Sequence, residues 1–387
     1  MSEFRSTRRA TSRDLIVGAT IAAIVEVGAD AVTLSDIANR AGVSRPTAYS
    51  MVGSVSGAFA EVWLSHGAAW LDRILMDEGD DDGSTDLPSA AVTALTDLVL
   101  IAGREPEVAE VLRSDLDRVW AAAVADGESA LLRLTWLLAT AIGVEASRGV
   151  SQNLELGALA LGLIRSMPPS VRRIVDLEGD VPPVGIPADS PRPTVLNPDE
   201  ITASLIDAAI TVAASAGVAR ASMLRICRVA GVTTGAGRPR FPSVEELILA
   251  GFDYEIGDVV DENIFAITTV SGGGTFMDLY GEFMRRGLSP QRTRWRQFRQ
   301  EMHLSARVND SIADALRASI TASERHLGAA ITAPSIGLSE VVANAALGVN
   351  QVLSVGIPAL YRIGLPVDTL DHRVPLRWVY RSMIGEI

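Results

Sequence analysis

The chain of 387 residues has no lysine, one cysteine and four histidines, so all of its 34 Lys or Arg side chains are arginines. A single cysteine, Cys227, excludes a framework of intrachain disulfides and a thiolate metal cluster. A chain with so little cysteine suits a reducing compartment. We therefore expect a cytoplasmic protein with no metal site and no cofactor.

Signatures of catalysis are also lacking. The histidines are scattered, with no HExxH pair and no GxSxG elbow, and they lie at His66, His303, His326 and His372. The run Gly272-Gly273-Gly274 follows no predicted strand and is followed by no lysine, which excludes a phosphate-binding loop. We expect no catalytic residues and no enzyme activity.

Long hydrophobic runs are scarce as well. The chain begins with the polar residues MSEFRSTRRATSRD, and no apolar signal-peptide core follows them before the first amphipathic helix. The longest uncharged run, between Glu340 and Arg362, contains Asn350, Gln351 and Pro358, which are costly in lipid. We expect a buried interface helix there and no membrane partner.

Acidic residues outnumber basic ones, and the net charge of −13 makes the chain as a whole a poor binder of nucleic acid. Any DNA contact must therefore come from a local basic surface. Residues 1–60 are about neutral, because six arginines balance five acids there, while the rest of the chain is strongly acidic. This N-terminal segment is the first candidate for DNA contact.

The stretch from Thr33 to Val52 has the pattern of two short helices joined by a tight turn. One apolar helix face is formed by residues at i, i+3, i+4 and i+7, namely Leu34, Ile37, Ala38 and Ala41. Gly42 can adopt the positive φ that ends a helix, and Ser44 is a good N-cap for a second helix with Pro46 in its first turn. In a helix-turn-helix, the second helix lies in the DNA major groove.

The pattern AxxAGVSxxTxYxxxxS from Ala38 to Ser54, preceded by a long helix and Gly28, resembles the TetR family of bacterial repressors. The resemblance implies an N-terminal DNA-binding domain, a larger all-helical ligand domain and a two-fold dimer. It also implies double-stranded operator DNA and a small-molecule effector as partners. The family usually has a basic residue where Val55 stands, so one phosphate contact is not carried over.

The helix-turn-helix pattern recurs 189 residues later without a gap. The identical pairs are Gly28/Gly217, Ile37/Ile226, Ala41/Ala230, Gly42/Gly231, Val43/Val232, Ser54/Ser243 and Val55/Val244. The second copy departs in its reading helix, where Gly235, Gly237 and Pro239 are poor helix formers. We expect this second reading helix to be short or broken.

These observations predict an all-α fold of two tandem TetR-like units, each a three-helix DNA-binding domain plus a helical ligand-binding and dimerisation domain. The two units are expected to form an intrachain pseudo-dimer, with further homodimerisation left open. The predicted segments are a helix-turn-helix domain at 1–57, a helical domain at 58–177, a proline-rich linker at 178–197, a degenerate helix-turn-helix domain at 198–246 and a second helical domain at 247–387.

The predicted function is a one-component transcription regulator, a repressor whose affinity for DNA a small molecule modulates. The alternative is a helical protein that binds small molecules or serves as an interaction scaffold without binding DNA. The predicted DNA contacts are Arg13, Thr33, Ser44, Arg45, Pro46, Thr47 and Tyr49 in the first copy and Thr233, Thr234, Arg238 and Arg240 in the second. The predicted ligand-pocket residues are Trp120, Trp136, Trp295, Phe298 and His303.

Two charged segments allow more than one interpretation. The acidic segment 77–86 is expected to be a solvated loop rather than a calcium loop, because Ser89 stands where a closing glutamate is required. Arginines and aromatic residues interleave at 285–299, a pattern compatible with a nucleic-acid groove or an anionic-ligand site. The composition favours a helix with a solvated arginine face, neutralised by Glu282 and Glu301.

Overall fold

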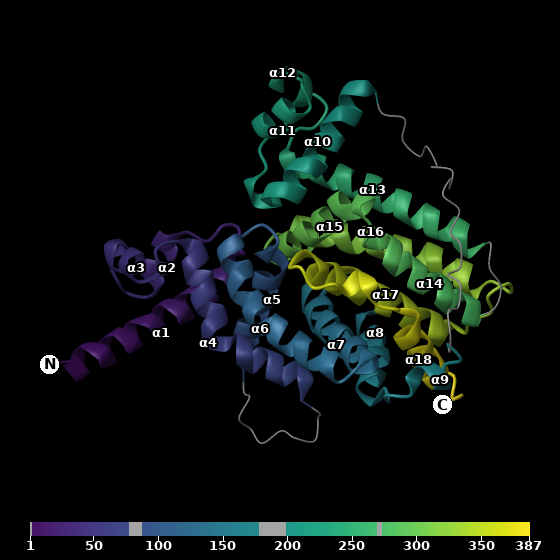
Figure 1. The fold of residues 1–387 in the computed structure, drawn as a ribbon. Coiled ribbons are helices and arrows are strands. Elements are labelled where there is room, and N and C mark those ends of the chain that lie inside the picture. Colours follow the sequence, from purple (N-terminus) through teal and green to yellow (C-terminus); the bar gives the residue numbers. More distant parts are fainter. Residues whose placement is uncertain (1, 77–86, 178–198, 269–272) are drawn as a thin grey trace. The chain divides into compact units, whose positions relative to one another are not determined.

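The computed structural model describes residues 2–76, 87–177, 199–268 and 273–387 (Figure 1). Within these ranges the regular secondary structure is entirely helical, which confirms the predicted all-α class. The acidic segment 77–86 and the predicted linker 178–197 lie outside the described residues. The chain divides into two compact units, one formed by residues 1–122 with 362–365 and the other by 123–361 with 366–387.

The first unit contains six helices in its described part. They are α1 (Ser2–Val27), α2 (Leu34–Arg40), α3 (Arg45–Val52), α4 (Val55–Leu75), α5 (Ser89–Ala102) and the start of α6 (Pro106–Ala125). Ile16, Ala23 and Ile24 of α1 are fully buried, at the spacing of one helix face. α1 packs on α2, α4 and α5, so the helix-turn-helix rests on a long amphipathic helix.

The second unit holds the remaining helices. Its first part comprises α7 (Glu128–Ala146), α8 (Leu154–Gly162), η1 (Leu163–Ser166) and α9 (Val171–Ile174). Its second part comprises α10 (Glu200–Ala216), η2 (Val218–Arg220), α11 (Met223–Val229), α12 (Thr234–Gly237), α13 (Val244–Ile267), α14 (Gly273–Gly287), η3 (Pro290–Arg292), α15 (Thr293–Ala306), α16 (Asp310–Thr332), α17 (Glu340–Arg362), η4 (Val367–Thr369) and α18 (Arg373–Met383).

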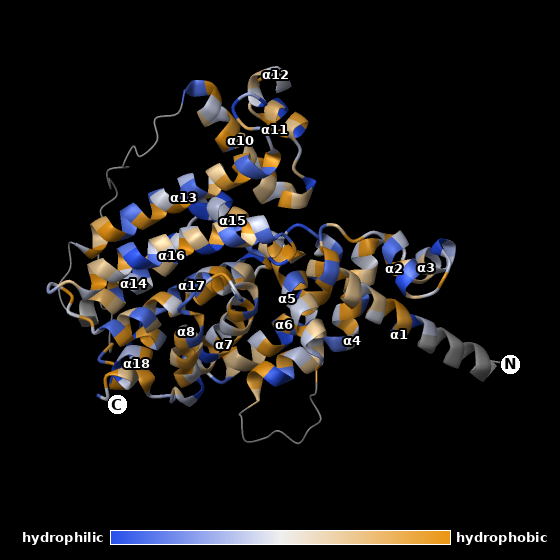
Figure 2. Cartoon of the chain, turned by 180° about the vertical axis from the view of Figure 1, so that it is seen from behind, coloured by the Kyte–Doolittle hydropathy of each residue, from blue (hydrophilic) through white to orange (hydrophobic). Residues whose placement is uncertain are grey.

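The main core of the second unit joins α10, α13, α15 and α16. Phe252 on α13 contacts Trp295 and Phe298 on α15, with ring centroids 5.6 and 6.2 Å apart. Figure 2 shows that hydrophobic and hydrophilic residues follow one another along α13 and α16, and each helix buries part of its hydrophobic residues. Buried residues occur along α13 from Leu247 to Ile267, so both ends of the helix contact the core.

α17 packs against α7 and α8 with direct backbone contact. A Cβ atom on Gly143 of α7 would lie 2.1 Å from the carbonyl oxygen of Val352, and one on Gly157 of α8 would lie 2.3 Å from the carbonyl carbon of Gly348. α7 and α17 are long and apolar enough to cross a membrane by length and composition, and 56% and 72% of their most apolar segments are buried inside the protein. The burial of α17 agrees with the predicted interface helix.

α18 closes the same unit. The Trp136 indole N–H on α7 donates to His372 Nδ1 at 3.1 Å, just before α18 begins. The Trp378 indole N–H on α18 donates to the carbonyl oxygen of Leu163 at 2.9 Å. These two hydrogen bonds join residues more than two hundred positions apart. They hold α18 and the residue before it against α7 and η1.

Candidate functional site

The α2–α3 segment has the capped geometry of a helix-turn-helix. Thr33 and Asp36 form a reciprocal capping box at the start of α2, and the hydrogen bonds from Thr33 lower the pKa of the Asp36 carboxyl. Gly42 has a φ of +66°, and the Val43 N–H donates to the Ala38 carbonyl oxygen at 3.0 Å. Ser44 then caps α3 by accepting from the Thr47 N–H at 3.2 Å. The predicted DNA contacts Thr33 and Ser44 therefore have structural roles as caps.

α3 presents a polar face to solvent over its eight residues. Ala48 is fully buried against the domain, while Arg45, Pro46 and Thr47 are exposed and Tyr49 is 64% exposed. Among the described residues, Arg45 and Tyr49 have no hydrogen-bond or ion-pair partner. Their side chains are therefore available to an external ligand without breaking an internal bond.

Two further arginines near the helix-turn-helix, Arg13 and Arg40, are paired with carboxylates. Arg13 pairs with Glu61 of α4 and keeps 55% of its side chain exposed. The same hydrogen bond raises the pKa of Arg13. Arg40 pairs with Glu26 at 2.8 Å. These cations reach a phosphate only by exchanging a partner, which costs little at the surface.

The α10–α13 segment repeats the bonds of the first helix-turn-helix. Ser222 caps α11, because its hydroxyl oxygen accepts a hydrogen bond from the Arg225 N–H at 3.3 Å. The Val232 N–H donates to the Cys227 carbonyl oxygen at 3.0 Å. Gly231 has a φ of +70°. Each of these residues stands 189 positions after its counterpart in the first segment.

α12 differs from α3 in length, since it ends after four residues at Gly237. A Cβ on Gly237 would lie 2.8 Å from Cys227 Sγ. The first segment has the smaller Ala38 at the position of Cys227. The larger Cys227 therefore leaves room only for glycine at position 237. The predicted contact Thr233 caps α12, and Thr234 is exposed. The short α12 confirms the expectation drawn from Gly235, Gly237 and Pro239.

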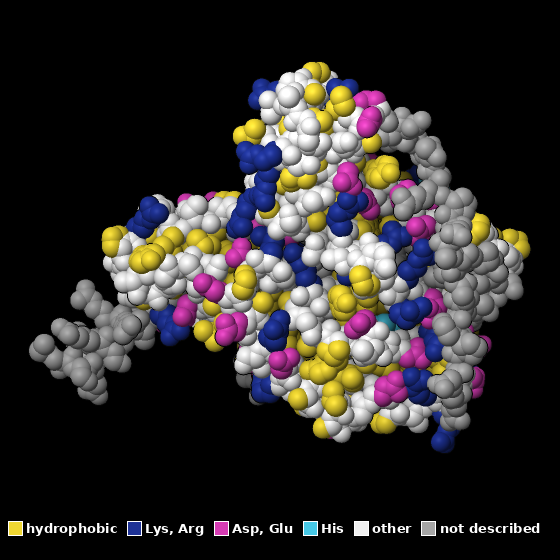
Figure 3. All heavy atoms as spheres, turned by 45° about the horizontal axis from the view of Figure 1, so that its top comes forward, with side chains coloured by type: hydrophobic (Ala, Val, Ile, Leu, Met, Phe, Trp, Pro, Cys, Tyr) yellow, Lys and Arg dark blue, Asp and Glu magenta, His cyan; other side chains and the backbone are white. Residues whose placement is uncertain are grey.

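The two arginines after α12 are held differently. Arg240 pairs with Asp199 at 3.1 Å and donates to the Ala236 carbonyl oxygen at 3.0 Å. Hydrogen bonds lower the pKa of Asp199 to about 2, with the largest effect from Thr202 and the next largest from Arg240. Arg238 is exposed and has no partner among the described residues. Figure 3 shows that basic side chains gather over the α10–α12 segment.

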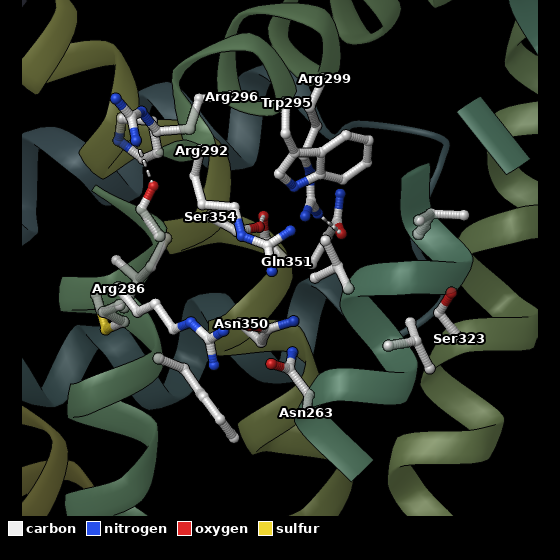
Figure 4. A pocket seen from close by; sticks show the side chains of 18 of the residues that line it. Asn263, Arg286, Arg292, Trp295, Arg296, Arg299, Ser323, Asn350, Gln351 and Ser354 are labelled. Carbon is white, nitrogen blue, oxygen red and sulfur yellow. Dashed lines mark hydrogen bonds between the residues drawn. The ribbon is translucent and has the colours of Figure 1, made fainter. Parts of the chain in front are cut away.

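A cavity of about 140 Å³ lies in the second unit between α13, α14, α15, α16 and α17. Four arginines line it, Arg286, Arg292, Arg296 and Arg299, together with Trp295 (Figure 4). Arg299 Nη2 donates to Gln351 Oε1 at 2.6 Å, and burial lowers the pKa of Arg299 to about 10, which keeps it charged at neutral pH. The predicted solvated arginine face is therefore wrong for these residues, because the helices turn them inward.

Two groups next to the cavity extend a buried polar network toward α7. Gln351 Nε2 donates to Ser147 Oγ at 3.3 Å and lies 3.4 Å from His303 Nε2. His303 Nδ1 lies 3.2 Å from the Ala146 carbonyl oxygen, and burial lowers the pKa of His303 to about 3. The neutral imidazole donates from Nδ1 and accepts at Nε2, so each polar atom of the histidine has a partner.

The predicted pocket residues of the second unit do not line one site. Trp295 lines the cavity, and His303 joins the network beside it. Phe298 is a core residue next to Phe252, and Trp136 is buried beside His372. Trp120 is half-buried and belongs to the first unit. Sequence reasoning missed Arg299 and Gln351 as a pair because they are 52 positions apart.

Residues 16–50 match the family model described as bacterial regulatory proteins of the tetR family. A protein of Mycobacterium bovis described as an uncharacterized HTH-type transcriptional regulator is 34% identical to this chain over 118 residues, which are 30% of this chain and 57% of the relative. Similar proteins of two Mycobacterium tuberculosis strains, described in the same words, are each 33% identical over the same length and shares. The chain thus spans 57% of the length of the curated relatives it matches. Its N-terminal helix-turn-helix has homologues among TetR-type regulators.

Proposed function

We propose that this chain is a one-component transcription regulator that binds operator DNA through α3. The observation that carries the proposal is the exposed, unpartnered pair of Arg45 and Tyr49 on a capped helix whose opposite side, at Ala48, is buried. In a helix-turn-helix the N-terminal side chains of the second helix reach base edges. Arg45 fits a bidentate contact with guanine, and Tyr49 fits a hydrogen bond to a base or a phosphate.

The proposed architecture is a tandem duplication that folds as an intrachain pseudo-dimer. The repeated caps and turns at a constant spacing of 189 residues support the duplication. The backbone contact of α17 with α7 and α8 supports pairing within one chain, because helices from the two halves of the sequence form one compact unit. A duplicated unit joined by a linker has a high effective concentration of its own partner.

The proposed regulation starts in the cavity of the second unit. α13 lines this cavity with Ile256 and Val260, and the N-terminal half of the same helix packs on α10, where Gly251 lies against Ile210. A ligand that displaces α13 therefore displaces the α10–α12 segment. We propose a repressor whose affinity for DNA changes when a small molecule occupies this cavity, because the relatives of its helix-turn-helix are TetR-type regulators.

Gel shift with genomic fragments from the source organism tests the proposal, followed by selection of bound sequences from a random pool. We expect one well-specified half-site beside a degenerate flank, since α3 offers base contacts while the short α12 leaves mainly arginine–phosphate contacts. No shift at low salt with any fragment would favour the alternative of a small-molecule-binding or scaffold protein. A strong perfect palindrome would contradict the asymmetric arrangement.

A further inference from the structure

The cavity of the second unit holds more cationic than anionic charge. Arg286 and Arg292 share one carboxylate, Glu262, with Arg286 Nη2 at 3.5 Å from Glu262 Oε2. Arg296 is satisfied by main-chain oxygens, since its Nη1 donates to Gly287 and Ser289 at 2.6 Å. Arg296 therefore fixes the turn between α14 and α15, and the other three arginines are the candidates for contact with a bound anion.

Arg299 forms no salt bridge with a carboxylate of the described residues, and the charge of Glu324 acts on it only from beyond ion-pair distance. Its Nη2 is bonded to the neutral amide of Gln351, and its Nε is shielded from solvent with no acceptor among the described residues. The carboxylate of Glu324 accepts hydrogen bonds from Ser151 at 2.8 Å and from Asn153 at 3.0 Å instead. A buried guanidinium ordinarily has an ion pair, because removing a charge from water is costly.

The other wall of the cavity is apolar. It is formed by aliphatic and aromatic side chains of α13, α14, α16 and α17, among them Val260, Phe283, Ile320, Leu327, Leu353 and Ile357. Figure 4 shows Arg286, Arg292 and Arg299 directed toward one region, with Asn263, Asn350 and Gln351 beside it. The cavity thus offers cations and amides at one part and hydrocarbon at another.

We propose that this cavity binds an amphipathic organic anion, with a carboxylate at the Arg286, Arg292 and Arg299 cluster and a hydrocarbon body along the apolar wall. Arginine suits this role because a planar guanidinium forms paired hydrogen bonds with a carboxylate. The inference rests on the proposed function, since it assigns a chemical class to the small molecule that modulates DNA binding.

Isothermal titration of the full-length protein with octanoate, octan-1-ol and octylamine tests the proposal, because the three probes differ only in the head group. We expect octanoate to bind at least about tenfold more tightly than octan-1-ol, the ratio given by one hydrogen bond to a charged group, and octylamine to bind most weakly. Intrinsic fluorescence provides a second readout, because Trp295 lines the cavity.

Arg299→Met should bring octanoate binding close to that of octan-1-ol. Arg285→Gln is the matched control, because Arg285 is 62% exposed, pairs with Glu282 and does not line the cavity. Equal binding of the three probes, or an equal loss of octanoate binding in both variants, would overturn the proposal. If Arg299→Met does not fold, the affinities of the unmodified protein for the three probes still test the proposal.

These titrations contain no DNA, so their outcome is separate from that of the gel shift. Preference for octanoate together with no DNA binding would uphold the ligand class and refute the regulator. DNA binding together with no preference for octanoate would support the regulator and refute the ligand class.

Discussion

Gly143 of α7 lies against the main chain of Val352 of α17, where a Cβ atom would approach the carbonyl oxygen to 2.1 Å. Two helices whose sequences lie in different halves of the chain approach this closely because one residue has no side chain. The contact places Gln351 beside Ser147 and so connects the cavity to the end of α7.

Gly143→Ala should destabilise the protein by about 1–3 kcal/mol, the usual cost of forcing a methyl group into a closely packed site. Urea denaturation followed by circular dichroism measures the change. Gly257→Ala is the control, because nothing lies within 4 Å of its added Cβ in the middle of α13. It should stabilise by up to about 1 kcal/mol through better helix propensity. A Gly143→Ala protein as stable as the unmodified one would show that α7 and α17 do not pack as described.

Arg45→Ala should weaken operator binding by about 1–3 kcal/mol, because it removes a possible contact with a guanine base. Arg238→Ala should cost less, since Arg238 follows a helix of four residues and is expected to contact phosphate. Fluorescence anisotropy with a labelled operator at one salt concentration compares them. Equal losses of affinity in the two variants would contradict the expectation that the first helix-turn-helix contributes more to operator binding than the second.

Light scattering at micromolar concentration should give the mass of one chain, 40.9 kDa, if the halves pair within the chain. A mass near twice that value would mean that halves pair between chains or that pseudo-dimers associate further. Repeating the measurement with the operator present tells whether DNA recruits a second chain.

His303 should make the protein less stable in acid. Burial lowers the pKa of its imidazole to about 3, below the usual value near 6.5, so the unfolded chain binds a proton that the folded chain does not. The free energy of unfolding therefore rises with pH between about 3 and 6.5, by up to about 1.4 kcal/mol per pH unit for this one group. His372 is also buried with a lowered pKa and adds to the same slope.

Denaturation of the unmodified protein and of His303→Asn across this pH range measures the effect. The variant should show the shallower dependence, whatever its stability at neutral pH. His326→Asn is the control, because His326 is exposed on α16. The same slope in all three proteins would mean that His303 is not the group responsible. Glu324 has the opposite effect on the pH dependence, because burial raises the pKa of its carboxyl. Its contribution to the free energy of unfolding therefore decreases as pH rises past 4.5.

The sequence by itself determined the local structure of this protein. Thr33, Gly42 and Ser44 act through bonds to residues within five positions, so the caps and the turn of the first helix-turn-helix are encoded where they occur. The short α12 follows from the same kind of cause, because Gly235 and Pro239 disfavour a helix in any context.

Only the tertiary structure decided which side of α15 faces inward. Composition favoured solvated arginines at 285–299, and the side chains of Arg285 and Arg294 do remain 62% and 42% exposed. Arg296 and Arg299 are turned toward the cavity because Trp295 and Phe298 on the same helix pack on Phe252, which fixes the rotation of α15. Their partners Gly287 and Gln351 come from α14 and α17, at sequence distances that local patterns do not encode.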